Sequence, residues 1–226
     1  MRNTNQMLIA TSTICWISLI FNLAALGSPE WMVGIAKWPT GKMTTLQFSL
    51  FKKCQVLPYV EHGNGTTING TNIEPALCYR YPEKYFFQDT EDPGRWKKET
   101  ADWGRETATG ILLILALFGI LASALNITAA LYDAQKITFY IRMALVQAAV
   151  AVVCSFVAIL VYGTTLYKDP HVQFVAKNPY ASVTLRWGYW LAVAHCLLST
   201  AGVSLIIFTL RRINYLKVKS HVCNEP

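Results

Sequence analysis

The chain has 226 residues, of which 53% are hydrophobic and only 15% are charged. A soluble domain rarely combines so large an apolar fraction with so few charges, which excludes an ordinary soluble globular protein. The formal net charge of +7 could indicate nucleic-acid binding, but the ten basic residues in segment 27–107 are balanced by ten acidic ones. No nucleic-acid partner is therefore expected.

Four apolar stretches contain no Asp, Glu, Lys or Arg, and all nine prolines lie outside them. They cover residues 7–26, 108–131, 143–162 and 188–210. Each has about 20 residues or more, which is enough helix to cross a hydrocarbon core of roughly 30 Å. A charge at mid-bilayer costs about 2.5–3.5 kcal/mol, so their absence is informative. The sequence predicts a single four-span membrane domain over residues 1–226.

The first stretch has a possible alternative, because Ala25-Leu26-Gly27 resembles a signal-peptide cleavage site that follows a thin positive region at Arg2. Its length of about 20 residues exceeds the usual apolar core of a signal peptide, roughly 7–15 residues. We expect a retained helix, with a cleaved signal peptide as the alternative.

The polar segment 27–107 contains three strand-like stretches. Residues 44–51 and 76–81 alternate apolar and polar side chains, the period of a half-buried strand, and residues 30–38 form a third candidate. These stretches predict a small antiparallel sheet. Residues 95–106 mix charge with tryptophan, which predicts a short amphipathic helix at the membrane surface.

Cys54 and Cys78 are the cysteines of this segment, and both lie at or near the ends of strand-like stretches. A disulfide between them is the simplest pairing in an oxidising compartment. Asn64 and Asn69 begin N-glycosylation sequons, Asn64-Gly65-Thr66 and Asn69-Gly70-Thr71, which are usable only on the lumenal side. His62 is the one histidine of the segment, so no metal site is expected there.

Four spans bring both ends of the chain to the same side of the membrane. Basic residues cluster after the last span, as the positive-inside rule expects at the cytoplasmic face; they are Arg211, Arg212, Lys217 and Lys219. We therefore expect loops 27–107 and 163–187 to be extracellular. The connection 132–142, the tail 211–226 and both termini are expected to be cytoplasmic.

A few polar and aromatic residues lie inside or beside the spans. The polar ones have no carboxylate or lysine partner in any span, so we expect them to form hydrogen bonds between helices; they are Asn22, Asn126, Gln147 and His195. The aromatic residues Tyr162, Trp187 and Trp190 lie at span ends and predict an interfacial belt.

The layout resembles the claudin superfamily, which includes the peripheral and epithelial membrane proteins, calcium-channel gamma subunits and clarins. The family signature is a Trp after the first span, then Gly-Leu-Trp, two residues and Cys, and later a second Cys. The corresponding residues here are Trp31, Ser49, Leu50, Phe51, Cys54 and Cys78. The likeness covers the whole chain in layout, and Ser49 and Phe51 depart from the motif.

This resemblance implies a four-helix bundle with a small extracellular antiparallel sheet, and a Trp31 ring that packs under that sheet. The 24 positions between the two cysteines are nearer to the gamma-subunit and other divergent branches. The aromatic residues around Gly188 resemble the start of the fourth span in gamma-subunit-like and clarin-like members.

The sequence contains no phosphate-binding Gly-rich loop, serine elbow or metal-ligand spacing, so we expect no enzyme and no cofactor. The resemblance implies a plasma-membrane protein that organises cell-surface or cell–cell contacts, at junctions, through its first loop. Its expected partners are the lipid bilayer, a membrane protein on the same or an adjacent cell, and a further copy of the chain. An auxiliary subunit of a channel or receptor is the alternative. A paracellular pore is disfavoured because the loop has no net charge.

Overall fold

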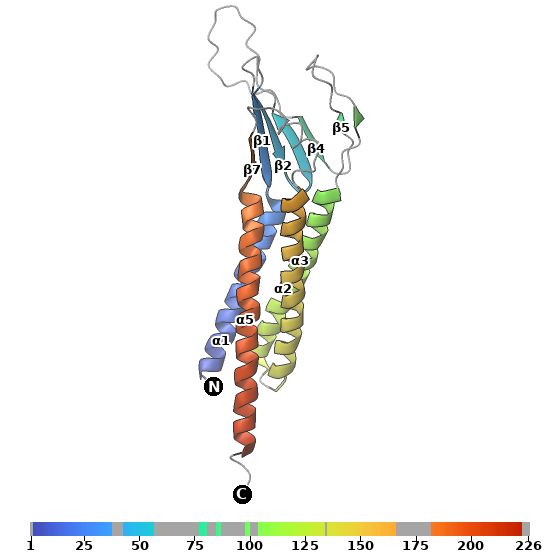
Figure 1. Cartoon of the computed structure of the whole chain (residues 1–226). Coiled ribbons are helices and arrows are strands. Elements are labelled where there is room, and N and C mark those ends of the chain that lie inside the picture. Colours follow the sequence, from blue (N-terminus) through green and yellow to red (C-terminus); the bar gives the residue numbers. More distant parts are fainter. Residues whose placement is uncertain are drawn as a thin grey trace, which may run out of the picture. The chain divides into compact units, whose positions relative to one another are not determined.

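The four charge-free stretches form four long helices in the computed structural model, which describes residues 2–37, 43–56, 77–80, 85–86, 98–99, 104–133, 135–165 and 182–222 (Figure 1). The helices are α1 (Arg2–Gly27), α2 (Gly104–Tyr132), α3 (Ile137–Thr165) and α5 (Trp187–Val222). Each is long and apolar enough to cross a membrane. The prediction of four long apolar helices is confirmed, and it indicates a multi-pass membrane protein in a lipid bilayer.

The helices extend beyond the charge-free stretches. α3 begins at Ile137, within the expected connection, and α5 continues to Val222, through most of the expected tail. Arginine and lysine are good helix formers, so a helix does not end where its apolar stretch ends. Between α2 and α3, a carboxylate oxygen of Asp133 accepts hydrogen bonds from the backbone N–H groups of Gln135 and Lys136 and so stabilises the turn.

The chain forms two compact units, which we describe separately. The helical unit comprises Met1–Leu26, Ile111–Ile159 and Leu191–Pro226, and the sheet unit comprises Gly27–Gly110 and Leu160–Trp190.

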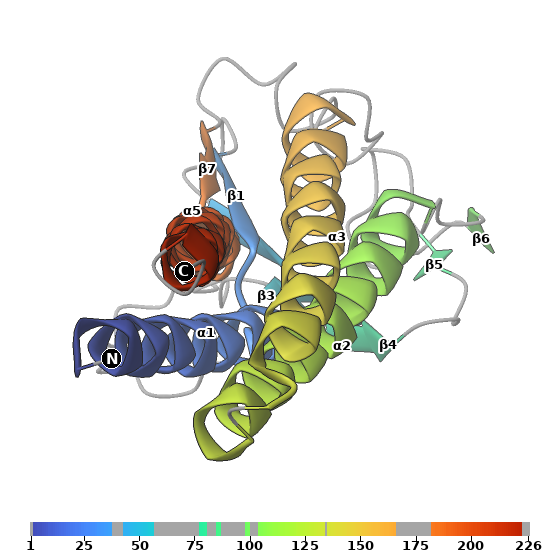
Figure 2. The same cartoon turned by 90° about the horizontal axis from the view of Figure 1, so that it is seen from below.

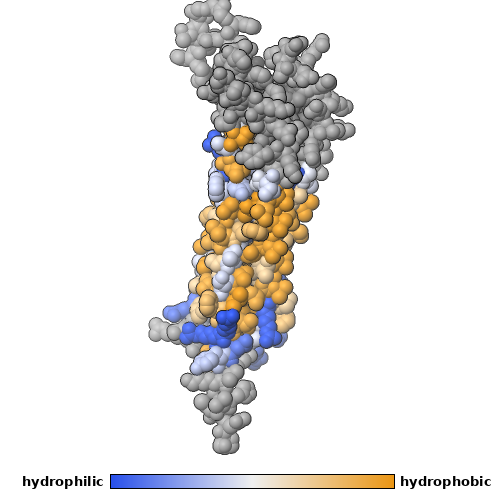
Figure 3. Space-filling view, in the orientation of Figure 1, coloured by the Kyte–Doolittle hydropathy of each residue, from blue (hydrophilic) through white to orange (hydrophobic). Residues whose placement is uncertain are grey.

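Small and medium-sized apolar side chains fill the core of the helical unit, and its four helices appear in Figure 2, where α5 is seen end-on. The buried residues include Leu8, Cys15, Ala116, Ile120, Ala144, Ala148 and Ile206. Large apolar side chains point outward and stay more than half exposed; examples are Ile20, Phe118, Val153 and Leu197. The outer face is accordingly apolar over the middle of this unit (Figure 3), as a lipid-facing surface requires.

The sheet unit contains a five-stranded antiparallel sheet with the order β4-β3-β2-β1-β7 (Figure 1). Its strands are β1 (Met32–Lys37), β2 (Met43–Phe48), β3 (Lys52–Val56), β4 (Leu77–Arg80) and β7 (Ser182–Leu185). The prediction of a small antiparallel sheet is confirmed, and strands form within the candidate ranges 30–38 and 76–81.

The single strand expected over residues 44–51 is wrong at its end. Phe48 of β2 is the Cα partner of Lys53 of β3, so the chain must reverse between them. Ser49, Leu50 and Phe51 make this reversal instead of extending the strand. Apolar alternation alone does not reveal a turn, since Leu50 is buried in the turn much as it would be in a strand.

The helix expected over residues 95–106 is also wrong in part. β5 (Tyr85–Phe86) pairs with β6 (Lys98–Glu99) in a separate two-stranded sheet, and α2 begins only at Gly104. Pairing with a partner strand outweighs the local amphipathic pattern at these two residues.

Candidate interaction site: the sheet and its buried aromatic anchor

Trp31 connects the segment after α1 to two other parts of the sheet unit. Its backbone N–H donates to the carbonyl of Phe48 at 2.7 Å, and its carbonyl accepts from the N–H of Arg186 at 3.0 Å. The side chain is completely buried. Trp31 therefore lies where β2 and the start of α5 meet β1.

Two tyrosine rings from other helices pack against this indole. The ring of Tyr162, near the end of α3, is 4.9 Å from the Trp31 ring at an interplanar angle of 58°. The ring of Tyr189, in the first turn of α5, is 6.4 Å away at 81°. Tilted and edge-on pairs of this kind contribute about 0.5–1.5 kcal/mol beyond the burial of their area. We call Trp31, Tyr162 and Tyr189 the aromatic anchor.

A buried ion pair lies against the anchor. The guanidinium carbon of Arg105 is 4.9 Å from the centre of the Tyr162 ring, and Arg105 Nη2 donates to a carboxylate oxygen of Glu106. The two side chains are 7% and 0% exposed. Burying a charge is costly unless it is paired, so the carboxylate and the ring together compensate for the desolvation of the guanidinium.

Gly188 allows the backbone of α5 to approach the segment after α1. Its N–H donates to the carbonyl of Glu30 at 3.0 Å. A Cβ atom at Gly188 would clash with Ser28 Oγ and lie 2.7 Å from the Glu30 carbonyl oxygen. Only glycine fits this contact without a shift of the backbone.

The three residues of the turn between β2 and β3 differ in exposure. Ser49 and Leu50 are buried, whereas Phe51 is 46% exposed. The edge of the Phe51 ring would lie 3.4 Å from a Cβ at Gly110, which is ordinary contact. Phe51 is thus the side chain of this turn that can meet a partner.

The two cysteines of the expected disulfide lie on neighbouring strands. Cys54 of β3 and Cys78 of β4 are Cα partners in the antiparallel register. Their side chains, and the sequon residues Asn64 and Asn69, lie outside the part of the chain that is described at that level.

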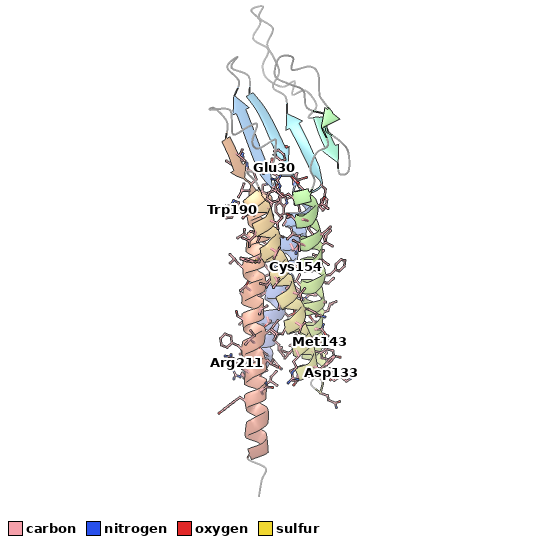
Figure 4. All side chains as sticks on the ribbon, turned by 45° about the vertical axis from the view of Figure 1, so that its right-hand side comes forward. Glu30, Asp133, Met143, Cys154, Trp190 and Arg211 are labelled. Carbon is pink, nitrogen blue, oxygen red and sulfur yellow. The ribbon has the colours of Figure 1, made fainter. Side chains whose placement is uncertain are left out.

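The aromatic belt expected at the span ends is corrected for one residue. Tyr162 has no exposed surface, because it packs on Trp31 and under Arg105. Trp187 and Trp190 are 48% and 57% exposed, and Figure 4 labels Trp190 on α5. Whether an aromatic ring lies in the interfacial belt depends on the direction in which it points, and packing sets that direction.

A polar cluster in the helical unit connects α1 to α5. The Nδ1 atom of His195 is 2.9 Å from the Ser18 carbonyl oxygen, and Asn22 Nδ2 is 3.0 Å from His195 Nε2. A proton on Nδ1 and a lone pair on Nε2 satisfy both contacts, so the partners indicate a neutral imidazole.

Hydroxyl groups complete this cluster. Ser18 Oγ is 2.8 Å from Ser199 Oγ, and Asn22 Nδ2 also donates to the Leu113 carbonyl at 3.3 Å. Interhelical hydrogen bonding by Asn22 and His195 is confirmed. Ser18 and Ser199 were not predicted, because serine is common in helices that cross membranes and carries no distinctive pattern.

The described residues contain no group of three or more His, Cys, Asp or Glu side chains that could hold a metal ion. No protein-family model matches the chain, and no curated protein does so either.

Proposed function

We propose that this chain is a non-enzymatic, claudin-like plasma-membrane protein that organises cell-surface or cell–cell contacts through the segment 27–107. The observation that carries the proposal is the construction of the sheet. β7, from the segment between α3 and α5, pairs with β1 from the segment between α1 and α2. Both segments therefore contribute to one surface.

The aromatic anchor supports this role because it makes the sheet a preformed surface. A surface that is ordered before binding loses less conformational entropy on association than a flexible loop does. The hydrogen bonds of Trp31 to Phe48 and Arg186, together with its two tyrosine contacts, hold the base of the sheet in one arrangement.

The edge of the sheet offers a means of binding. Within the described residues, β7 has β1 as its one neighbour and forms an edge of the sheet. Such edges bind extended segments of partner proteins by adding a strand. The balanced charge of segment 27–107 favours protein contact over an ion path.

The proposal includes the orientation of the chain in the membrane. The two sequons support an extracellular position of segment 27–107, and the basic residues after the last span support cytoplasmic termini. The plasma membrane, with enrichment at cell junctions, is the proposed location.

Expression in cells that lack junctions tests the proposal. Expressing and non-expressing cells, each marked with its own dye, are grown together, and we expect the protein to concentrate at borders between two expressing cells. Phe51→Asp, which changes the exposed residue of the β2–β3 turn, should reach the surface and lose this enrichment. Diffuse surface staining of the unchanged protein would refute the adhesive role.

An auxiliary subunit of a channel or receptor is the second candidate. The observation that favours it is the separation of 24 positions between Cys54 and Cys78, which resembles the gamma-subunit branch. Purification in mild detergent followed by mass spectrometry should then find one channel or receptor in stoichiometric amount. Recovery of the chain without such a partner would count against this candidate.

A further inference from the structure

α2 and α3 approach closely within the helical unit, and an amide pair lies at one point of their seam. A Cβ atom at Gly119 would lie 3.2 Å from Ala151 Cβ, and Ser123 Oγ donates to the Ala144 carbonyl at 3.0 Å. Towards the end of α2, Asn126 Nδ2 donates to Gln147 Oε1 at 2.8 Å. Gln147 lies on α3 between Met143 and Cys154, which are labelled in Figure 4.

The Ala122 carbonyl determines which way the amide of Asn126 is turned, and through it that of Gln147. Asn126 Nδ2 also donates to the Ala122 carbonyl at 2.9 Å, so its oxygen cannot occupy that place without repulsion. Both N–H groups of Asn126 are therefore used within the chain. Gln147 must accept through its oxygen, and its own NH₂ group points elsewhere.

This arrangement leaves a donor and an acceptor on the same seam. Within the part of the chain that the structure describes, Asn126 Oδ1 and Gln147 Nε2 make no hydrogen bond. Both side chains are half-buried, and Leu125 and Val146 beside them are 53% and 61% exposed. Neither Asn126 Oδ1 nor Gln147 Nε2 is among the fully buried polar atoms without a partner, so both free amide groups reach the surface of the helical unit.

Their depth makes the unused groups costly. Asn126 lies five residues before the end of the charge-free stretch 108–131, about 8 Å along α2, and Gln147 lies four residues inside the stretch 143–162, about 6 Å along α3. Both fall within helices that are apolar enough to span a membrane. Lipid tails offer no hydrogen-bond partner, so a polar group at this depth favours contact with another polar group.

We propose that the amide seam, formed by Ala122, Asn126 and Gln147, is the contact surface of a homodimer within the membrane. The seam is self-complementary, because it carries one free amide donor and one free amide acceptor. In a two-fold dimer, Gln147 Nε2 of each copy donates to Asn126 Oδ1 of the other, so two hydrogen bonds satisfy both unused groups of both copies. Ala122, half-buried on the same side, lets the second pair of helices approach.

Single-molecule photobleaching of the full-length chain in liposomes, at high lipid dilution and with one dye per copy, tests this proposal. The unchanged protein should bleach in two steps. Gln147→Met keeps the side-chain length but removes the donor, and it should weaken dimerisation by about tenfold or more. Ala122→Leu keeps the amide pair and blocks close approach, so it should have the same effect.

Ser204→Ala is the matched control. It removes an exposed polar group of α5 whose hydroxyl donates only within its own helix, to the Thr200 carbonyl, and it should leave dimerisation unchanged. Circular dichroism and thermal unfolding check that every variant is folded. A monomeric unchanged protein would overturn the proposal, and so would dimers that persist in folded Ala122→Leu and Gln147→Met.

Discussion

The ring of Trp31 lies 4.9 Å from the ring of Tyr162, and the contact joins the segment after α1 to the end of α3. Both side chains are completely buried. The base of the sheet is thereby tied to the end of α3, and its stability should depend on this pair more than on any exposed aromatic residue.

Replacement of either ring by a methyl group should destabilise the sheet unit. Trp31→Ala and Tyr162→Ala each remove a buried aromatic side chain, which costs about 3–5 kcal/mol in protein cores. Size-exclusion chromatography after heating should show a lower midpoint temperature for both. Trp190→Ala, at a residue 57% exposed, is the control and should change the midpoint little. Equal midpoint temperatures for all three variants would contradict the stabilising role of the aromatic anchor.

Gly188→Ala should disrupt the approach of α5 to Glu30. The new Cβ would clash with Ser28 Oγ and lie 2.7 Å from the Glu30 carbonyl oxygen, and a backbone carbonyl cannot rotate away. We expect reduced delivery to the cell surface and a lower unfolding temperature. Gly27→Ala introduces the same methyl group with nothing within 4 Å and should be tolerated. Normal behaviour of Gly188→Ala would show that the contact is looser than the structure indicates.

Removal of one charge from the buried pair of Arg105 and Glu106 should lower the stability more than removal of both charges. Glu106→Gln leaves the Arg105 guanidinium without its carboxylate, which for buried pairs costs about 3–5 kcal/mol. The double change Arg105→Met with Glu106→Leu removes both charges of this pair and should recover much of this loss. Thermal unfolding of the two variants in parallel measures the difference, and a double variant less stable than Glu106→Gln would refute the argument.

His195→Leu should loosen the contact between α1 and α5. It leaves Asn22 and the Ser18 carbonyl without their imidazole partner, and an unsatisfied buried polar group costs about 1–3 kcal/mol. A second change, Asn22→Leu, should cost less in the His195→Leu background than alone, since the two residues share one hydrogen bond. Thr13→Val is the control, because its hydroxyl is exposed and donates within its own helix. Strictly additive effects would contradict the shared bond.

A disulfide between Cys54 and Cys78 is expected from the register of β3 and β4. Partner Cα atoms in antiparallel strands are about 4.5–5.5 Å apart, within the range of about 4.4–6.8 Å that disulfides require. Mass spectrometry of unreduced proteolytic peptides should find the two linked. Cys54→Ser and Cys78→Ser should each reduce surface delivery, whereas Cys154→Ser, at a free cysteine in α3, should not. Recovery of both peptides with free thiols would exclude the bridge.

The local pattern of the sequence was sufficient to predict the helices and part of the sheet. A helix that crosses lipid must be apolar throughout, so four charge-free stretches reveal it without knowledge of its neighbours. The alternation over residues 44–48 and around Leu77 likewise indicates β2 and β4, because a half-buried strand has a period of two.

Other features had no local pattern. β3 begins Lys52-Lys53 and carries Gln55, so its polar sequence does not resemble a strand, and it forms because β2 and β4 pair with it on both sides. β7 is a four-residue strand whose partner, β1, precedes it by most of the chain.

The sequence alone therefore determined that this is a four-span membrane protein with a small sheet, since composition and period are properties of single segments. Tertiary structure decided that Tyr162 is an anchor instead of an interfacial ring, that Arg105 and Glu106 are buried together, and that Asn126 and Gln147 pair at the surface of the bundle. Each of these facts depends on which distant segment a side chain meets, and that is set by packing.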